Sequence, residues 1–447
     1  MSNIDLNSIV AKQLKRQRPK DGDEGTFDIA ISTEDILSKV DYVLRTEIEP
    51  MDMACGGLPF GRIVELYGLE SCGKSALCIR SLIKAQLGNI WQRTAGVDGF
   101  GPTFKKVDPE KIAVTTVFID NEQSVDEDEK ITVDGVLLDC ILSRCDTVDQ
   151  IFKMCDIVIE KVKEKQEEEN KKAKEEKRDP IVFFVVIVID TIAGTSSKQE
   201  MTKDWNKEDF QRQPKMLSEG FRRMNREINR HNVLMICTNQ VREAFKQSAP
   251  GQRKIHYSTP QNDDFSTFGG RALKFYSSLR IFMFRLNENY KLSAARFSQG
   301  YLIGFRTQKN RQVKPLREGR MVILFEGGLS NIYSKLETLT FLGLLSYSSA
   351  TKRLTVKFSK FGIVPTTFTT APTKKSAGRS LEDDDDRGRS TIDPDLPSKK
   401  EWPEFYAAHQ ADLDLLWEKA REVMFSDQPV GEEQSDEDDD MDMDEDK

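Results

Sequence analysis

Residues 62–88 read RIVELYGLESCGKSALCIRSLIKAQLG, in which a strand-like apolar stretch, a glycine-containing loop and a helix-like stretch follow one another directly. Residues 68–75 fit the pattern GxxxxGK[ST], whose backbone N–H groups wrap around phosphate oxygens at the start of a helix. The strand before the loop and the helix after it are the context that this pattern requires. The sequence therefore predicts a phosphate-binding loop formed by Gly68, Leu69, Glu70, Ser71, Cys72, Gly73, Lys74 and Ser75.

The stretches that follow this loop predict the class of fold. Strand-like and helix-like segments alternate, at residues 113–120 (strand), 147–162 (helix), 181–190 (strand), 215–230 (helix) and 233–238 (strand). This alternation is typical of an α/β domain with a mainly parallel central sheet. Further strands are expected at residues 279–285, 301–307 and 320–325, and the helical spacing at 402–425 indicates a small C-terminal helical element.

Three stretches interrupt the pattern. Residues 89–112 are rich in glycine, proline and polar residues and are predicted to form an inserted loop. Residues 163–180 continue a helix but are charged on all faces, so we expect a helical extension exposed to solvent. Residues 365–400 are poor in apolar residues and rich in turn formers, which indicates a flexible linker.

We expect the chain to have four parts. These are a basic N-terminal polymerisation arm with a short helix at 1–30, a core at 31–350, a linker with a small C-terminal domain at 351–430, and a disordered acidic tail at 431–447. The tail carries eleven acidic residues and one lysine, a net charge of −10, whereas the whole chain carries −8. The preceding residues therefore carry +2, and the tail is either an interaction segment or a solubility tail.

Composition excludes several classes of protein. Of the 447 residues, 38% are hydrophobic and 31% are charged, which is enough for a core beneath a highly charged surface. The longest apolar run, residues 181–189, is shorter than the ~20 residues of a membrane helix, and no apolar stretch typical of a secretory signal is visible near the N-terminus. Seven cysteines without a CxxC pair, and only three histidines, argue against disulfides and zinc and favour the reducing cytoplasm.

Polar residues at the ends of the predicted strands complete the phosphate site. Asp190 can hold Mg²⁺ together with the hydroxyl of Ser75, although a helix N-cap is the alternative role. Glu122 can orient a water for attack on the terminal phosphate, although taken alone it reads as a surface acid. The amide of Gln240 can sense that phosphate or form a structural turn. With Lys74 on the terminal phosphates, ATP and Mg²⁺ are the expected substrate and cofactor.

These elements, in this order, resemble the RecA recombinase family. The resemblance is carried by GGLPFGRIVELYGLESCGKS (56–75), FIDNEQSVD (118–126), VIVIDTIAG (186–194), ICTNQVRE (236–243), GGRALKFYSSLRI (269–281), QKNRQVKP (308–315) and FEGGLSNIYSKLETLTFLGLL (325–345). It covers residues 30–350 approximately, and the stretch 269–281 is the most specific to the family. It implies a RecA-like P-loop ATPase core and a DNA-dependent ATPase. Such an enzyme forms filaments on single-stranded DNA and promotes homologous pairing and strand exchange in recombination and repair.

The resemblance also implies roles for single residues. Glu122 falls on the catalytic glutamate of the family, Gln240 on its sensor glutamine, and Asp126 on a nucleotide contact. Lys309 and Arg311 fall where two lysines reach across to the ATP of a neighbouring subunit. Phe275 and Arg280 fall at two further interface positions of the family. Lys274 falls at a further position that contacts the ATP of the neighbour. The N-terminal arm is expected to pack on the next subunit.

The resemblance also implies two DNA-binding loops, at residues 196–213 and 241–268. The second contains aromatic residues, including Phe268, among the cations Arg242, Lys246, Arg253 and Lys254. Cations neutralise phosphates while rings contact bases, although an ordinary polar loop is the alternative. The resemblance adds Gly269, Gly270 and Arg271 to the DNA contacts. The expected partners are single- and double-stranded DNA, further copies of the chain, and single-strand-binding and loader proteins, but no membrane.

The chain departs from the family at several positions. The tyrosine that stacks on adenine is replaced near Glu129, and the second bridging lysine is an arginine. The second DNA loop is long, and residues 89–112 and 163–180 are insertions. These departures favour a phage- or virus-encoded relative acting in the cytoplasm of a bacterial host.

Two other functions share the same ATPase core. One is a ring-forming replicative helicase, against which the stretch 269–281 and the bridging cations argue. The other is a recombination mediator that binds ATP but hydrolyses little, against which the complete set of phosphate-site residues argues.

Overall fold

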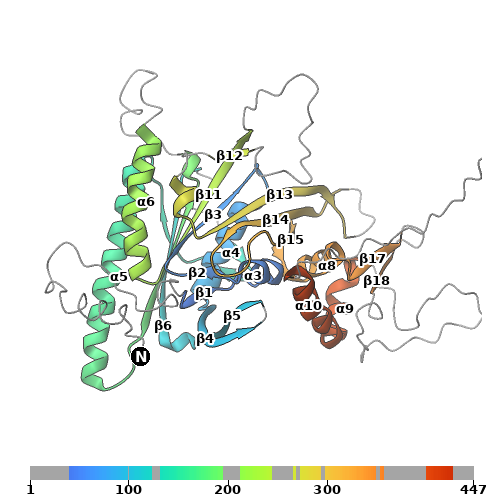
Figure 1. Ribbon diagram of the computed structural model, residues 1–447, viewed down its shortest axis with the longest axis horizontal. Helices are drawn as coiled ribbons and strands as arrows, with labels where there is room; N and C mark the ends of the chain where they lie inside the picture. The colour runs from blue at the N-terminus through green and yellow to red at the C-terminus, as the bar shows by residue number, and fades with distance from the viewer. Residues whose placement is uncertain are drawn as a thin grey trace, which may run out of the picture. The chain divides into compact units, whose positions relative to one another are not determined.

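A mixed sheet of ten strands lies at the centre of the computed structural model (Figure 1). The structure describes residues 40–98, 100–122, 131–194, 212–243, 265–267, 272–292, 297–348, 353–356 and 399–425. The chain divides into two units, residues 1–41 and 42–447, and all elements described below belong to the second unit. The predicted arm at 1–30, most of the linker at 365–400 and the tail at 431–447 lie outside the described residues.

The strands of this sheet follow the order β16-β15-β14-β13-β3-β11-β10-β6-β9, and β12 pairs with the end of β11. They are β3 (Arg62–Gly68), β6 (Ile112–Asp120), β9 (Ile141–Ser143), β10 (Val182–Asp190), β11 (Val233–Glu243), β12 (Phe265–Thr267), β13 (Leu279–Tyr290), β14 (Gly300–Asn310), β15 (Glu318–Leu324) and β16 (Gly328–Ser330). The strands from β13 to β9 run parallel, and β14 to β16 add an antiparallel edge. The predicted α/β fold with a mainly parallel sheet is confirmed.

Parallel pairing brings the functional ends of the central strands to one edge of the sheet. Gln240 of β11 lies opposite Gly68 of β3, and Asp190 of β10 lies opposite Asp120 of β6. Ligands bind at the carboxyl ends of strands in open α/β sheets, and four of the predicted site segments begin there.

Helices cover both faces of the sheet (Figure 1). On one face, α3 (Glu49–Cys55) and α4 (Lys74–Gln86) pack in the same buried cluster as Val64. On the other face, α5 (Val148–Glu176) and α6 (Arg212–Arg230) pack in the same cluster as Ile63. Adjacent residues of β3 thus point to opposite faces, and both faces are covered, which is why β3 is buried along its whole length and β10 is apolar up to Asp190. The short helix α7 (Ala272–Tyr276) precedes β13.

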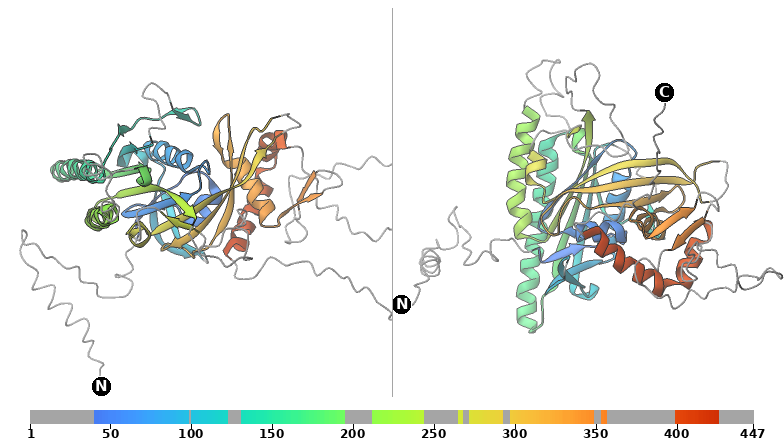
Figure 2. Two further views of the ribbon diagram at one scale, coloured as in Figure 1. Left: turned by 90° about the horizontal axis from the view of Figure 1, so that it is seen from above. Right: turned by 45° about the vertical axis from the view of Figure 1, so that its right-hand side comes forward.

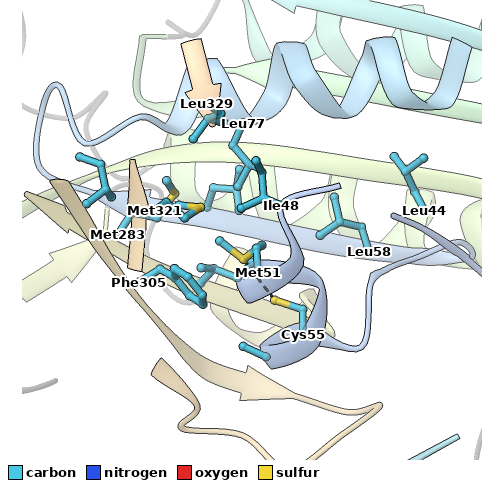
Figure 3. Close-up of a cluster of buried hydrophobic side chains, with 14 of the residues drawn as sticks. Leu44, Ile48, Met51, Cys55, Leu58, Leu77, Met283, Phe305, Met321 and Leu329 are labelled. Carbon is cyan, nitrogen blue, oxygen red and sulfur yellow. Dashed lines mark hydrogen bonds between the residues drawn. The ribbon is translucent and has the colours of Figure 1, made fainter. Parts of the chain in front are cut away.

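The core on the α3 face contains several sulfur atoms (Figure 3). Met51 and Cys55 of α3 lie one turn apart, with 3.4 Å between their sulfur atoms. Met283 of β13, Phe305 of β14 and Met321 of β15 belong to the same fully buried cluster. Unbranched methionine side chains fill irregular gaps, and here they join α3 to the antiparallel edge of the sheet.

Residues 89–112 do not form the loop that the sequence predicts. They form β4 (Ile90–Asp98) and β5 (Gly101–Lys106), an antiparallel pair in a second sheet of order β2-β1-β4-β5. Its other strands are β1 (Tyr42–Leu44) and β2 (Leu58–Pro59). The prediction was wrong because only Ile90 of β4 is buried, so this strand lacks the apolar alternation that marks most strands.

The charged run after residue 162 continues α5, as predicted. The helix begins with a capping box, in which the Thr147 hydroxyl accepts from the Gln150 N–H and the Gln150 side chain accepts from the Thr147 N–H. Most of the extension is exposed, but its Gln166 side chain accepts from the N–H of Phe183 at 2.8 Å and donates to the carbonyl of Ile181 at 2.9 Å. The extension therefore supplies hydrogen-bond partners to backbone groups at the start of β10. A short hairpin, β7 (Thr132–Val133) and β8 (Val136–Leu137), precedes β9.

The C-terminal residues form helices, as predicted for 402–425. α9 (Trp402–Ala408) and α10 (Gln410–Phe425) pack against α8 (Asn331–Phe341) (Figure 2). Trp402 is fully buried beside Tyr333, and Lys335 of α8 forms ion pairs with Glu49 and Asp414. β17 (Leu345–Ser348) and β18 (Arg353–Val356) pair with each other. Within the described part of the chain, every helix is too short or too polar to cross a bilayer.

We expect Gly220→Ala to lower the free energy of unfolding by about 1–3 kcal/mol, because the added methyl group overpacks the contact between α5 and α6. A Cβ on Gly220 would lie 2.1 Å from the ring of Phe152. Urea denaturation of the full chain measures the loss, and Glu219→Ala at the adjacent exposed position is the control. A G220A protein as stable as the wild type would contradict this close packing.

Candidate nucleotide site

The loop at 68–75 requires glycine at two positions. A Cβ on Gly68 would lie 2.0 Å from the backbone oxygen of Met283, and one on Gly73 would lie 2.5 Å from Cδ1 of Ile323. Gly73 and Ser71 also adopt left-handed backbone conformations, with φ of +84° and +54°. The loop therefore packs closely against β13 and β15, and α4 begins at Lys74, within the motif.

Lys74 points into this loop. Its Nζ donates to the carbonyls of Leu69 at 2.7 Å and Gly68 at 3.2 Å, and lies 3.7 Å from Sγ of Cys72. Burial raises the pKa of the Cys72 thiol, although the ammonium of Lys74 acts in the opposite direction. With the N-terminus of α4 behind it, the loop offers N–H donors and one ammonium group to an anion.

Asp190 lies at the end of β10 and is almost fully buried. The hydroxyl of Thr238 on the neighbouring strand donates to its Oδ1. Its Oδ2 is also buried but has no hydrogen-bond partner among the described residues. A buried carboxylate oxygen without a protein partner fits a bound cation or its water. The hydroxyl of Ser75, in the first turn of α4, is the second candidate ligand in the described site.

Glu122 and Gln240 meet at the same edge of the sheet. The side-chain amide of Gln240 donates to Oε1 of Glu122 at 3.1 Å. The backbone before Glu122 is held by the N–H of Asn121, which donates to the carbonyl of Asp190 at 2.7 Å. Desolvation raises the pKa of the Glu122 carboxyl, and the negative charge of Asp190 raises it further. This contact joins the predicted water-activating acid to the predicted phosphate sensor, whereas Asp126 lies outside the described residues.

The residues expected at a subunit interface lie together near α7. Nζ of Lys309 donates to the carbonyls of Lys274 at 3.2 Å and Phe275 at 3.0 Å. The side chain of Phe275 is 71% exposed, and Lys274 and Arg311 are also exposed. Burial lowers the pKa of Lys309 to about 8, and the positive charges of Arg311 and Arg280 contribute to the shift. Two exposed cations and an exposed aromatic ring thus share one surface with the half-buried Lys309.

Arg280 differs from these residues because it is buried within the chain. Its guanidinium pairs with the carboxylate of Glu65, which is fully buried, and lies 4.5 Å from the ring centroid of Tyr67. Burial raises the pKa of Tyr67 to about 12. The other carboxylate oxygen of Glu65 accepts from the side chain of Asn239 at 3.0 Å. This position argues against a direct contact of Arg280 with another subunit and gives it a role in the sheet.

Most of the predicted DNA contacts lie outside the described residues. These are Lys246, Arg253, Lys254, Phe268, Gly269, Gly270 and Arg271, together with the side chain of Arg242. The structure describes the base of the second loop, where β12 pairs antiparallel with the end of β11. Its first pair, Val241 with Thr267, directly follows Gln240.

Sequence reasoning missed Arg285 of β13. Its Nε and Nη2 donate to the carbonyl of Ser71 at 3.3 and 2.9 Å, and its guanidinium lies 4.2 Å from the ring centroid of Tyr301. Tyr301 in turn packs edge-on against Phe325, which is 56% exposed. Arg285 therefore fixes the left-handed residue of the phosphate loop. A lone arginine in an extended strand carries no local signal for such a contact.

Comparisons with known proteins show which proteins this chain resembles. The family model described as RecA N-terminal domain matches residues 182–330, which include Asp190, Gln240 and the cations at 309 and 311. The chain is 28% identical over 296 residues to Protein RecA of Methylococcus capsulatus, covering 64% of this chain and 67% of that protein. It is 26% identical over 306 residues to Protein RecA of Aquifex aeolicus, covering 67% and 71%, respectively. It is 26% identical over 294 residues to Protein RecA of Laribacter hongkongensis, covering 64% and 65%.

We expect Arg285→Ala to weaken nucleotide binding about fivefold, because losing two charged hydrogen bonds to Ser71 releases a strained loop at a net cost of about 1 kcal/mol. Titration of the isolated chain with a fluorescent ATP analogue measures the affinity. Arg285→Lys, which can keep one of the two bonds, should lie between the wild type and R285A. Equal affinities in all three proteins would refute the role of Arg285.

We also expect Lys309→Met to flatten the pH dependence of stability between pH ~8 and ~10.5. The pKa of Lys309 is about 8 in the folded chain and 10.5 as its ordinary value, so the unfolded chain binds more protons in this window. Lys309 therefore makes the free energy of unfolding of the wild type rise with pH across this window. K309M lacks this contribution. Urea denaturation across the window measures the difference, with Lys274→Met as the exposed control. Parallel wild-type and K309M curves would contradict the shifted pKa.

Proposed function

Because the chain belongs to the RecA family, we propose that it is an ATP-dependent recombinase that polymerises on single-stranded DNA and promotes strand exchange in recombination and DNA repair. The observation that carries this proposal is the 3.1 Å hydrogen bond between Gln240 and Glu122. It connects the residue that would act on the terminal phosphate to the strand that leads into the second DNA loop. ATP hydrolysis and DNA binding can thereby influence each other.

The hydrolytic roles follow from the placement of each group. Lys74 and the N–H groups of the loop would bind the phosphates of ATP, and Ser75 and Asp190 would hold Mg²⁺. An ion held by these two residues would supply positive charge to the phosphate oxygens. Support for this cation comes from the buried, unpartnered Oδ2 of Asp190. Glu122 would orient the attacking water, and the amide of Gln240 would follow the loss of the terminal phosphate.

Assembly would complete each ATP site. Lys309, Arg311 and Lys274 would approach the phosphates bound by a neighbouring subunit, and Phe275 would pack in the interface. This assignment is supported by the register of β14, in which Lys309 lies opposite Arg280, three residues before the point where β13 meets Gly68. Lys309 therefore lies away from the phosphate loop of its own chain and beside exposed groups.

The proposed DNA surface begins at the same sheet edge as the phosphate site. The loops 196–213 and 241–268 would follow β10 and β11. The pairing of β11 with β12 supports a second loop whose two ends lie side by side. Cations of that loop would contact the DNA backbone, so binding should weaken as salt increases. We propose single- and double-stranded DNA, further copies of the chain, and single-strand-binding and loader proteins as partners, in the cytoplasm of a bacterial cell.

We expect Lys74→Ala to abolish ATP hydrolysis, and Glu122→Gln to retain ATP binding while turnover falls at least about 100-fold. The first change removes the ammonium group from the phosphates, whereas the second removes only the acid that orients water. Phosphate release with and without single-stranded DNA measures turnover, and nucleotide titration measures binding. Glu175→Gln on the exposed part of α5 is the control. Normal turnover by K74A or E122Q would overturn the catalytic assignment.

Electron microscopy tests the mode of assembly. We expect extended helical filaments that require both single-stranded DNA and a slowly hydrolysed ATP analogue. Closed rings would instead indicate a helicase. Particles that bind ATP but do not assemble on DNA, even with a candidate loader protein, would contradict the recombinase proposal.

A further inference from the structure

The segment that follows Lys309 is fastened by its own side chains. We call residues 310–317, which join β14 to β15, the bridging loop. Oδ1 of Asn310 accepts from the N–H groups of Gln312 at 2.8 Å and Val313 at 3.3 Å. Its Nδ2 donates to the carbonyl of Cys55 at 3.0 Å, at the C-terminal end of α3. The residue between the two bridging cations thus holds the loop to the core.

The hairpin β4–β5 reaches the same loop. Cγ1 of Val313 would lie 2.9 Å from a Cβ on Gly101, the first residue of β5, and 3.1 Å from one on Gly56. The loop therefore sits in contact with the hairpin on one side and the end of α3 on the other. Both glycines have positive φ and leave the space that Val313 occupies.

The C-terminal helix α10 closes this arrangement. The guanidinium of Arg317, in the bridging loop, lies 5.1 Å from the ring centroid of Phe425. Phe425 packs against Phe100 of the hairpin at 5.6 Å between centroids. One turn earlier in α10, Arg421 lies 4.8 Å from the ring centroid of Phe100 and donates to Oδ2 of Asp98 at 2.8 Å. Helix, hairpin and loop thus form one continuous set of contacts.

These contacts lie apart from the phosphate loop of the same chain. They border a cleft of about 940 Å³, whose walls include residues of α3, the hairpin and α10. No residue of the phosphate loop lines this cleft. The ion pair of Arg421 with Asp98 is only partly exposed, with 34% and 29% of the two side chains accessible. This ion pair does not contact the bridging loop itself, but it holds Phe100 and α10 in place, and Phe425 of α10 contacts Arg317 of the loop that carries Arg311.

We propose that the hairpin β4–β5 and α10 form a clamp on the bridging loop, and that Asp98, Phe100, Arg421 and Phe425 are positioning residues for ATP hydrolysis in the neighbouring subunit. The inference rests on the proposed function, because it assigns the clamp to the placement of the bridging cations. Misplacing a charged group by about 1 Å can cost up to about 100-fold in rate, so a loose loop should slow hydrolysis. The role of the insertion at 89–112 would then be to hold the bridging loop in place.

Reversing one charge of the clamp tests the proposal. We expect Arg421→Asp to lower DNA-stimulated ATP turnover about tenfold, while nucleotide affinity of the unassembled chain stays within about twofold of the wild type. The double variant Asp98→Arg with Arg421→Asp should recover most of the turnover, because it restores the ion pair. Lys419→Asp is the matched control, since Lys419 is 35% exposed on the same helix and pairs with Glu422 of that helix.

A mixing experiment asks whether the effect crosses the subunit interface. An R421D chain keeps its own Lys74 and Glu122, and an E122Q chain keeps an intact clamp. Filaments made from equal amounts of both should hydrolyse ATP several-fold faster than the mean of the two separate proteins. Turnover equal to that mean would overturn the inference.

Four further outcomes decide the proposal. Wild-type turnover in R421D would overturn it, and so would equal losses in R421D and K419D. A parallel loss of nucleotide affinity in the unassembled R421D chain would also overturn it, because the clamp would then act on its own site. A wild-type protein without DNA-stimulated turnover would overturn the proposed function, and the inference with it.

Discussion

The carboxylate of Glu65 fixes how the three central strands meet. It is fully buried in β3, pairs with Arg280 of β13 and accepts from Asn239 of β11. Leaving such a charge buried without its partner costs about 3–5 kcal/mol, so the three strands are held in the one register that satisfies it. The same register places Gln240 opposite Gly68 at the carboxyl edge of the sheet. The geometry of the phosphate site therefore depends on an ion pair that is buried between β3 and β13.

Local patterns in the sequence predicted the parts of the fold that are buried on both sides. β10 is apolar up to Asp190, β3 carries apolar residues on both faces beside its buried Glu65, and the loop at 68–75 matches the spacing of a phosphate-binding loop. The hairpin β4–β5 escaped prediction because its stability comes from pairing with β1 and from contacts with α10, more than 300 residues away. Its own sequence shows glycine, proline and polar residues, which locally read as a loop.

The candidate site shows the same division between local and long-range information. Lys74, Glu122, Asp190 and Gln240 could be found because each lies at or shortly after the end of a strand that the sequence predicts. Arg285 and Glu65 could not be placed in this way, since their partners lie 214 and 215 residues away in sequence. For Arg280, family position suggested an interface, whereas burial against Glu65 gives it a role within the sheet. Position in a motif thus predicts chemistry better than it predicts which neighbour a side chain meets.

Among the described residues, two arginines and one carboxylate act on Lys309. Burial lowers the pKa of Lys309 most, the charges of Arg311 and Arg280 lower it further, and the buried carboxylate of Glu65 acts in the opposite direction. The carbonyls at the end of α7 hold the ammonium group, but they are neutral acceptors. An anion placed near these cations would favour the charged form of Lys309, and the charged form would bind the anion more tightly in return. In the proposed filament, the phosphates of the neighbouring ATP are that anion. Nucleotide binding and subunit association would then be linked by charge: the repulsion among the cations within one chain would be relieved when a second chain brings its ATP.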